Sequence, residues 1–426
     1  MTSFFSSTIA GVPRIGANRE LKFALEGFWS GQTSGRDLSH TATLLTNAYA
    51  DQLVAAGIDS VPTSGRSYYD AMLDTTALLG VFPERVQDIS DHENDGLPSF
   101  IDRYFATARG TAEAPASAMT KWFDTNYHYL VPELSAETRF ILDDAALLTD
   151  IKNQLTRGIN ARPVLIGPFT YLSLARTTDG SDALDHLETL FTVYERLLAK
   201  LPTQWVQLDE PSLVTDVSPE LLARVRAGYA ALAARGGVFV NTFFGAGDQA
   251  LDTLAGIGLG AIGVDLVSDG VTDLDAWTGE ELLVAGIVDG RNIWRTDLCT
   301  ALATLRRLQA RGPVAVSTSC SLLHVPYSLA PENINPEVRS WLAFGEEKIT
   351  EVAALARALA GEVDEALFDA SAAALADRRH SGLTRAQNQQ VSPADRERGE
   401  FGRRQAAQDK ALNLPPLPTT TIGSFP

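Results

Sequence analysis

The sequence predicts a (βα)8 barrel, an α/β fold in which eight parallel strands alternate with helices. Between residues 160 and 320, short β-rich runs alternate with longer amphipathic stretches. The β-rich runs are almost continuously apolar, which is typical of parallel strands that are covered on both faces. Eight such runs in a chain of 426 residues fit this barrel with room for an insertion and an appendage. A doubly wound open sheet is the alternative fold, which the number of strands alone does not exclude.

The expected strands, in chain order, are residues 7–11, 59–63, 162–167, 204–209, 237–244, 261–266, 282–288 and 313–320. A long insertion, roughly residues 64–160, separates the second strand from the third. It carries helix patterns and a ninth β-rich run, "YHYLV" (127–131). Among the helices that follow the strands, the one in "TDLCTALATLRRLQAR" (296–311) is expected to begin with Thr296 as its N-cap.

The β-rich runs end near residue 330, and helix patterns follow. The first of these opens with Asn335 as the expected cap and Pro336 in the first turn. We therefore divide the chain into a barrel (1–330), a helical connector (331–413) and a linker with a new first strand (414–426). The last part contains "TTIGSFP" (420–426), which repeats the pattern of "STIAGVP" (7–13). This repeat predicts a duplicated two-barrel protein in which a second barrel begins where the chain ends, although the sequence does not say whether that end is natural or engineered.

Composition and charge exclude several classes of protein. Apolar residues make up 45% of the chain, so a sizeable core is expected and general disorder is not. The formal net charge is −18, which is unfavourable for binding nucleic acid. The two cysteines, Cys299 and Cys320, form no disulfide pattern, and there is no signal peptide or membrane-spanning apolar run. We expect a cytoplasmic protein without membrane or nucleic-acid partners.

A cluster of basic residues follows the first expected strand. In a barrel of this kind the chemistry lies at the carboxyl ends of the strands. Here Arg14, Arg19 and Lys22 surround the start of a helix that Asn18 is expected to cap. Free N–H groups and the positive end of the helix dipole add to these charges, so the cluster suits a carboxylate or phosphate ligand. The alternative is a solvated face that pairs with neighbouring glutamates.

Two further groups of residues follow strands. Asp209 and Glu210 are candidates for an acid/base pair, but adjacent residues on a strand face opposite sides, so one of them is equally compatible with a structural carboxylate. Cys320 and His324 raise the question of a metal site. The other strand ends offer only Asn241, Thr242 and Asp265, without the further His or Cys ligands that zinc prefers, so no metal site is expected in this chain.

Several segments resemble a known family in order along the chain. The chain is similar to the N-terminal half of the cobalamin-independent methionine synthases, and the segments that carry the resemblance are "GVPRIGANRELKFALEGFW" (11–29), "MTKWFDTNYHYLVPE" (119–133), "WVQLDEPSL" (205–213), "VDGRNIWRTDL" (288–298), "SCSLLHVP" (319–326) and "TTTIGSFP" (419–426). The resemblance implies two face-to-face (βα)8 barrels that arose by duplication. It also implies transfer of a methyl group from 5-methyltetrahydropteroyl-polyglutamate to homocysteine, whose thiolate is bound by zinc in the second barrel.

The resemblance also assigns roles to individual residues. The folate glutamate tail is expected at Arg19, Glu20, Leu21, Lys22 and Lys121, and homocysteine at Ile422, Gly423 and Ser424. The zinc ligands and the rest of the catalytic barrel, which is the expected partner, lie outside this chain, so the chain alone is expected to hold no zinc and to be inactive. Two alternatives remain open. One is a free-standing barrel enzyme that uses Asp209, Glu210 and His324, and the other is a purely structural half.

Overall fold

The computed structural model describes residues 4–63, 66–92, 95–268, 274, 277–380, 392, 394 and 397–419. These residues form two compact units, one ending at Leu375 and one beginning at Ala376. The first unit contains the sheet and the candidate site.

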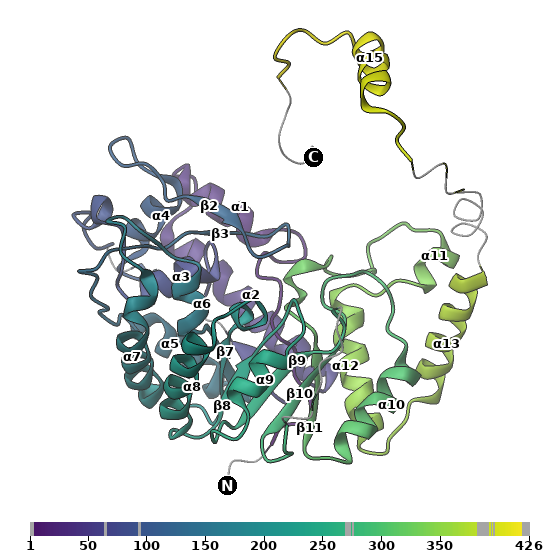
Figure 1. Ribbon diagram of the computed structural model, residues 1–426. Helices are drawn as coiled ribbons and strands as arrows, with labels where there is room; N and C mark the ends of the chain where they lie inside the picture. Colours follow the sequence, from purple (N-terminus) through teal and green to yellow (C-terminus); the bar gives the residue numbers. More distant parts are fainter. Residues whose placement is uncertain are drawn as a thin grey trace. The chain divides into compact units, whose positions relative to one another are not determined.

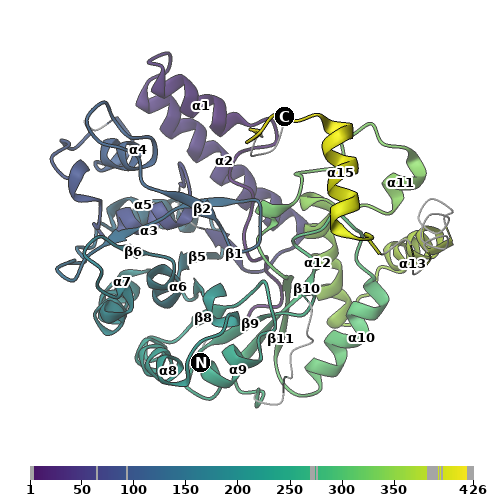
Figure 2. The same cartoon turned by 45° about the horizontal axis from the view of Figure 1, so that its top comes forward.

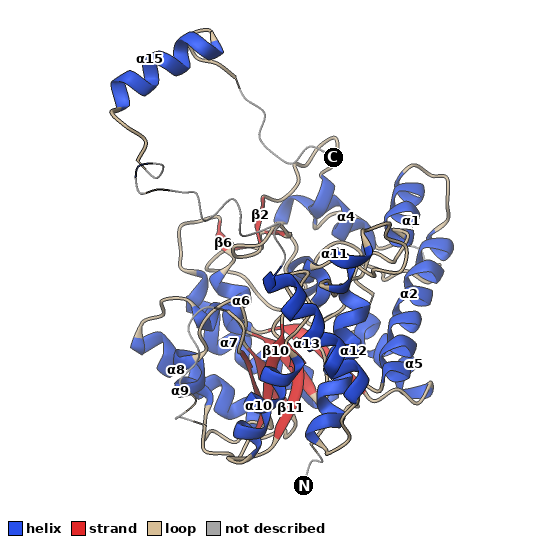
Figure 3. Ribbon diagram, turned by 90° about the vertical axis from the view of Figure 1, so that its right-hand side faces the viewer, coloured by secondary structure: helices blue, strands red, loops and turns tan. Residues whose placement is uncertain are grey.

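Within the described residues, the first unit is built on a seven-stranded sheet whose strands all pair in parallel. The order of the strands in the sheet follows their order in the chain, which is typical of a (βα)8 barrel. Helices surround the strands (Figure 3). The strands are β1 (Val61–Thr63), β5 (Ala161–Ile166), β7 (Val206–Asp209), β8 (Val238–Asn241), β9 (Ala261–Asp265), β10 (Leu282–Val288) and β11 (Val314–Thr318).

The N-terminal segment closes this sheet into a ring. The Thr8 amide donates to the Val316 carbonyl in β11 at 2.9 Å, and the Ser60 amide beside β1 donates to the Ser7 carbonyl at 3.0 Å. The two edges of the sheet are therefore joined through the predicted first strand, whose regular pairing is limited to one parallel bridge between Ser7 and Val316. The predicted (βα)8 barrel is confirmed, and the open sheet is wrong.

Helices cover the outside of the barrel and build the insertion (Figure 1). The predicted run 127–131 is confirmed as a strand of the insertion, where β2 (Met119–Lys121) and β3 (His128–Leu130) form an antiparallel hairpin. A short parallel pair joins β4 (Glu133–Leu134) to β6 (Arg176–Thr177). The helices are α1 (Glu20–Trp29), α2 (Gly35–Ala56), α3 (Ala71–Leu78), α4 (Ile101–Arg109), α5 (Ala145–Thr156), α6 (Pro168–Ser173), α7 (Leu187–Lys200), α8 (Pro219–Ala233), α9 (Asp248–Leu254), α10 (Leu298–Gln309), α11 (Pro336–Ser340), α12 (Gly345–Leu359), α13 (Glu365–His380) and α15 (Phe401–Leu412), with 3-10 turns at Glu84–Val86, Ala183–His186, Pro211–Val214 and Leu322–His324.

Two predicted helix caps are wrong, and one is confirmed. Asp297, not Thr296, caps α10 by accepting from the Thr300 amide at 3.0 Å, and Thr296 instead donates its amide and hydroxyl to Glu351 of α12. Asn18 does not cap α1; the cap position is Arg19, whose φ is 63°. Asn335 caps α11 as predicted.

The barrel unit continues past residue 330, where the sequence placed its end. Helix α12 packs against β11, β10 and α2. Its residues Ile349, Val352 and Leu355 belong to the main hydrophobic core. Helix α12 is therefore an outer helix of the barrel rather than part of a connector. In the second unit, α15 begins after the cap residue Glu400; residues 420–426, predicted to begin a second barrel, lie outside the described residues.

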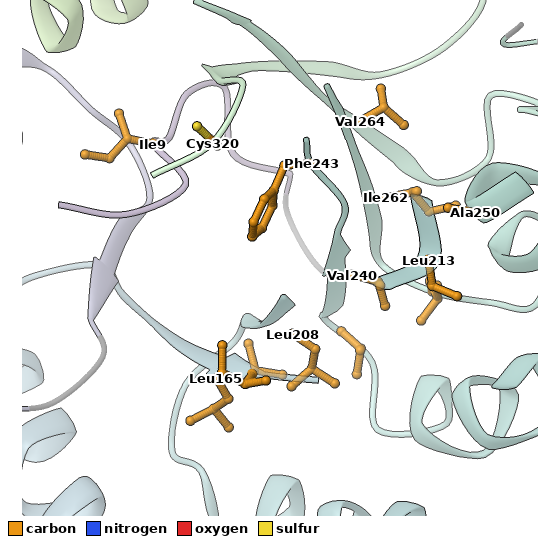
Figure 4. Packing of buried hydrophobic residues seen from close by; sticks show 14 of the residues in the cluster. Ile9, Leu165, Leu208, Leu213, Val240, Phe243, Ala250, Ile262, Val264 and Cys320 are labelled. Carbon is orange, nitrogen blue, oxygen red and sulfur yellow. The ribbon is translucent and has the colours of Figure 1, made fainter. Parts of the chain in front are cut away.

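Alternation along the strands separates two cores. In β8, Val238 and Val240 belong to the main core between strands and helices, whereas Phe239 belongs to a smaller cluster. Figure 4 shows part of the main core, where strand residues such as Ile262 meet Leu213 and Ala250 from the surrounding helical segments. We call the smaller cluster the barrel plug; its members are Phe5, Trp205, Phe239, Ala261, Leu282, Val284 and Ala315.

A buried arginine lies against this plug. Arg162 of β5 has no exposed surface, and its guanidinium lies 5.7 Å from the ring of Phe5 and 5.4 Å from that of Phe239. It donates to five acceptors, namely Gln207 Oε1, Thr8 Oγ1, Ser60 Oγ and the carbonyls of Ser60 and Ile9. Two of these belong to the N-terminal segment. Arg162 therefore holds the closing strand inside the ring.

Candidate functional site

A cavity of about 260 Å³ opens where the strands end. The barrel contributes Val164, Asp209 and Phe243 to its wall. Helices α1 to α5, the β2–β3 hairpin and the turn at Leu322–His324 enclose the remainder. Figure 1 shows α1 and the hairpin on the same side of the barrel, opposite to the N-terminus, and Figure 2 turns this side toward the viewer. The lining also includes Arg14, Leu21, Tyr49, Asp74, Tyr104, Trp122, Tyr127, Tyr129 and His324.

Arg14 is one of two described arginines that line this cavity; the other, Arg66, pairs with Asp150 at 3.0 Å. The Nη1 atom of Arg14 is buried and has no hydrogen-bond partner among the described residues. Burial lowers the pKa of Arg14, but the neighbouring Tyr127, Tyr104 and Asp74 more than compensate, so the pKa is raised overall. The guanidinium is therefore charged, and one of its donors is available to a ligand. The structure separates Arg14 from the exposed Arg19 and Lys22, with which the sequence had grouped it.

The insertion supplies two carboxyl groups that the sequence analysis missed, the buried Asp70 and the half-buried Asp74. Asp74 of α3 accepts from the Tyr104 hydroxyl at 2.6 Å, and burial raises its pKa to about 7. Asp70 caps α3, accepting from the amides of Met72 and Leu73 at 2.9 Å, and burial raises its pKa to about 6. Asp70 is structural, whereas Asp74 lines the cavity. The only signal in the sequence was an acidic residue inside an otherwise apolar helix, "AMLDTTAL".

The raised pKa of Asp74 predicts a stability that depends on pH. The folded pKa of about 7 exceeds the ordinary value of 3.8, so the contribution of Asp74 is fully present below 3.8 and is lost as pH rises through 7. In this window the group lowers the free energy of unfolding by up to about 1.4 kcal/mol per pH unit. Asp74→Asn, whose amide oxygen can still accept from Tyr104, is expected to flatten this slope in urea unfolding between pH 5 and pH 8. An exposed control, Asp88→Asn, should keep the slope, and an unchanged slope in Asp74→Asn would contradict the assignment.

Asp209 and Glu210 face opposite sides of β7. Asp209 Oδ1 accepts from Gln207 Nε2 at 2.6 Å and from Asn241 Nδ2 at 3.2 Å, and burial raises the pKa of Asp209 to about 6. Glu210 has no exposed surface and accepts from the amides of Phe169 and Thr170 at 3.0 and 2.7 Å. Glu210 is therefore the structural carboxylate that the sequence analysis left open, and Asp209 alone lines the cavity.

His324 and the turn of the hairpin form an aromatic cluster over the barrel. Phe123 and Phe244 both have positive φ, 51° and 77°, and their ring centroids are 5.7 Å apart. Arg291 lies 5.0 Å from the ring of Phe244 and pairs with Asp124 at 3.0 Å. Burial and then Arg291 lower the pKa of His324 to about 4. Because no hydrogen bond joins His324 to Asp209 or Glu210 in the described part of the chain, the arrangement gives the acid/base alternative no support.

Cys320 does not fit a zinc site. Zinc binds the thiolate, but burial raises the pKa of the fully buried Cys320 thiol. The nearby carboxylates of Asp265 and Asp289 already accept backbone amides of their own loops. Within the described ranges, no group of three or more His, Cys, Asp or Glu side chains is placed to hold a metal ion.

The residues expected to bind the folate tail lie on two segments that border the same cavity. Arg19, Lys22 and Lys121 are exposed. Leu21, which lies between the first two, and Trp122, which follows the third, both line the cavity. The start of α1 and strand β2 are thus brought to one site.

The remaining residues that the resemblance assigns to ligands are Glu20 and residues 422–424. Glu20 accepts from the amide and side chain of Asn18, at 3.0 and 3.1 Å, and does not point a free carboxylate outward. The residues expected at homocysteine, Ile422, Gly423 and Ser424, lie outside the described residues.

Comparison with known proteins identifies the family. Residues 6–313 match the family model described as "Cobalamin-independent synthase, N-terminal domain". The chain belongs to the cobalamin-independent methionine synthase family. It is 82% identical over its full length to a protein of Corynebacterium efficiens named 5-methyltetrahydropteroyltriglutamate–homocysteine methyltransferase. Proteins with the same name in Corynebacterium glutamicum strain R and Mycobacterium bovis strain BCG are 70% and 49% identical over 100% and 99% of the chain.

The chain matches only part of these methionine synthases, since it spans 57% of the length of each. A solved structure of a B12-independent methionine synthase from Shewanella sp. W3-18-1, in complex with selenomethionine, aligns with this chain at a TM-score of 0.56. The alignment covers 84% of this chain and 99% of the Shewanella chain. At 14% identity this likeness concerns the fold alone. No helix in the described part of this family member is long and apolar enough to cross a membrane.

Proposed function

We propose that the chain is the folate-tail-binding part of a methionine synthase that transfers a methyl group from 5-methyltetrahydropteroyl-polyglutamate to homocysteine. The names of the relatives support the reaction. The observation that carries the role of this part is that the exposed Lys22 and Lys121 are each adjacent in sequence to a residue that lines the cavity, Leu21 and Trp122. We call Arg19, Lys22 and Lys121 the tail cluster.

Electrostatics support the tail cluster as a site for an oligoglutamate. The net charge of −18 repels a polyanion, so binding requires a local group of cations. Lys22 pairs with the exposed Glu26 at 3.8 Å, and such i,i+4 pairs contribute about 0.3–0.5 kcal/mol. Arg19 adopts φ of 63°, a left-handed conformation that costs a non-glycine residue about 1 kcal/mol or more. A weakly engaged lysine and a strained arginine at a helix N-terminus are consistent with a ligand that stabilises both.

Lys22→Ala and Lys121→Ala are each expected to weaken binding of 5-methyltetrahydrofolate triglutamate by about two- to fivefold, as for exposed charge pairs. Binding of the monoglutamate should change less, because it lacks the outer carboxylates of the tail. The measurement is calorimetry on the purified 426-residue chain and repeats at higher salt, which should weaken triglutamate binding. Lys152→Ala, at another exposed lysine, is the control. Equal losses for both ligands would contradict the role of the tail cluster.

The rest of the reaction is proposed to need residues outside this chain. Zinc, when bound there, would lower the pKa of the homocysteine thiol and keep it nucleophilic. Ile422, Gly423 and Ser424 are proposed to contact homocysteine, and a second barrel is the proposed partner. The cysteine usage supports a cytoplasmic location.

The chain alone is expected to produce no methionine from 5-methyltetrahydrofolate triglutamate and homocysteine in the presence of zinc. A chain extended to the length of its relatives should be active and serves as the control. Turnover by the 426-residue chain would overturn this division of labour. A purely structural role remains the second candidate, because Glu210 and Arg162 show that other charged residues of the barrel are engaged in folding. It predicts that variants of the tail cluster alter stability but not folate binding.

A further inference from the structure

The cavity inside the barrel mouth has features of a ligand site that the tail cluster does not explain. The tail cluster is exposed on the rim, whereas the buried Nη1 of Arg14 belongs to the cavity wall. A buried donor without a partner costs about 1–3 kcal/mol. Thr63, another lining residue, also has a buried side-chain oxygen without a partner among the described residues. These groups favour a polar ligand inside the cavity.

The charge next to Arg14 favours an anionic ligand. Asp74 is the carboxyl group whose charge raises the pKa of Arg14. Its own pKa of about 7, however, leaves Asp74 partly protonated near neutral pH. It also already accepts from Tyr104. The structure gives Arg14 no salt bridge to any described residue within 4.0 Å, unlike Arg66, which pairs with Asp150 at 3.0 Å in the same wall. A ligand carboxylate would satisfy the guanidinium of Arg14 by a charge-assisted hydrogen bond.

The rest of the wall favours an aromatic body. Beside aliphatic side chains such as Leu21, Leu45 and Met72, the wall carries many aromatic rings, those of Tyr49, Tyr68, Phe100, Tyr104, Trp122, Tyr127, Tyr129 and Phe243. A volume of about 260 Å³ is small for a drug-sized ligand. It exceeds the roughly 150 Å³ of apolar cavities that bind benzene. At the barrel end, both donors to Asp209 reach Oδ1, so Oδ2 can accept from a ligand hydroxyl.

We propose that this cavity binds a small aromatic carboxylate, with the carboxylate held by Arg14 and the ring enclosed by the tyrosines and Trp122. The site lies between the strand ends of the barrel and the insertion, and its volume of about 260 Å³ is too small for a folate with its glutamate tail. The proposal does not rest on the proposed function, because it invokes neither the tail cluster nor methyl transfer.

The test is calorimetric titration of the full 426-residue chain with 4-hydroxybenzoate. One molecule is expected to bind per chain. The neutral amide, 4-hydroxybenzamide, has the same ring and hydroxyl group and is expected to bind about 10- to 100-fold more weakly, as for a lost hydrogen bond between charged groups. The Arg14→Met substitution should weaken the binding of 4-hydroxybenzoate to the same extent. Arg196→Met, at an exposed position on the outer helix α7, should leave binding unchanged.

Circular dichroism would reveal whether the Arg14→Met variant folds. If it does not, the comparison between 4-hydroxybenzoate and 4-hydroxybenzamide on the unaltered chain still tests the proposal. Equal affinity for the acid and the amide would overturn the proposal, as would the absence of binding up to the solubility limit of 4-hydroxybenzoate. Equal affinity of a folded Arg14→Met variant and the unaltered chain would overturn it as well. Tail-cluster binding of triglutamate is measured separately, so either proposal can fail without the other.

Discussion

Replacing Arg162 with leucine is expected to lower the free energy of unfolding by about 3 kcal/mol or more. The substitution leaves buried acceptors on Gln207, Thr8 and Ile9 without their donor. Each such group costs about 1–3 kcal/mol when it is left unsatisfied. Removal of the desolvated charge offsets part of the loss, since burial lowers the pKa of Arg162 to about 9. The net effect remains large because the same side chain also fills space above the barrel plug.

Urea unfolding monitored by circular dichroism checks this expectation. Arg196→Leu, an exposed control, should change stability by less than about 0.5 kcal/mol. If Arg162 holds the closing strand, the variant should also expose residues 6–11 to amide hydrogen exchange more than it exposes β8 or β9. Each acceptor left without a donor is expected to cost about 1–3 kcal/mol. A variant whose free energy of unfolding lies within about 1 kcal/mol of that of the unaltered chain would therefore contradict the prediction, because the polar groups would have found other partners.

Glu210→Leu is expected to cost about 3 kcal/mol. The carboxylate accepts from two amides at the start of α6 and from the Tyr229 hydroxyl, and all three donors would be buried without a partner. Burial raises the pKa of Glu210 from 4.5 to about 7, so the contribution of Glu210 is fully present below 4.5 and is lost as pH rises through 7, and this cost is expected to be smaller above pH 7 than at acid pH. Shape also constrains the site, because a side chain on Gly167 would meet Glu210 at 2.2 Å.

Glu210→Gln is the matched variant, since it keeps one acceptor oxygen and should cost less than Glu210→Leu in the same unfolding assay. Asp209→Asn keeps the acceptor for Gln207 and Asn241 and is expected to be nearly neutral for stability. A Glu210→Leu chain that is as stable as the Asp209→Asn chain would contradict the structural role of Glu210 and reopen the acid/base alternative.

The strands could be predicted because their signal is local. A run such as 282–288 is apolar on both faces, and β10 covers the same residues. The first strand was placed correctly, yet it pairs little, since its hydrogen bonds depend on β11 and on Arg162 rather than on its own composition. Thr296 likewise bonds a residue distant in sequence, Glu351, instead of capping α10.

The candidate site was predictable only at its rim. The basic start of α1 is contiguous in sequence, so Arg19 and Lys22 could be found by inspection. The cavity depends on contacts between Asp74 and Tyr104, 30 residues apart, which no short pattern encodes. Arg14 was assigned to the wrong group for the same reason, because spacing along the chain does not show which side chains turn inward. The extent of the barrel was missed because a helix pattern at 345–359 does not reveal the surface that it covers.

Closure of the ring by the N-terminal segment has a consequence for how the protein folds during synthesis. The segment leaves the ribosome first, but one of its partners lies far along the chain: the Ala10 amide donates to Thr318, 308 residues later. Such a contact adds to the slow, non-local part of folding. Until β11 has been made, β1 and the nascent sheet present unpaired strand edges, which favour aggregation. A chaperone that shields such edges would therefore help most before the N-terminal segment pairs with β11.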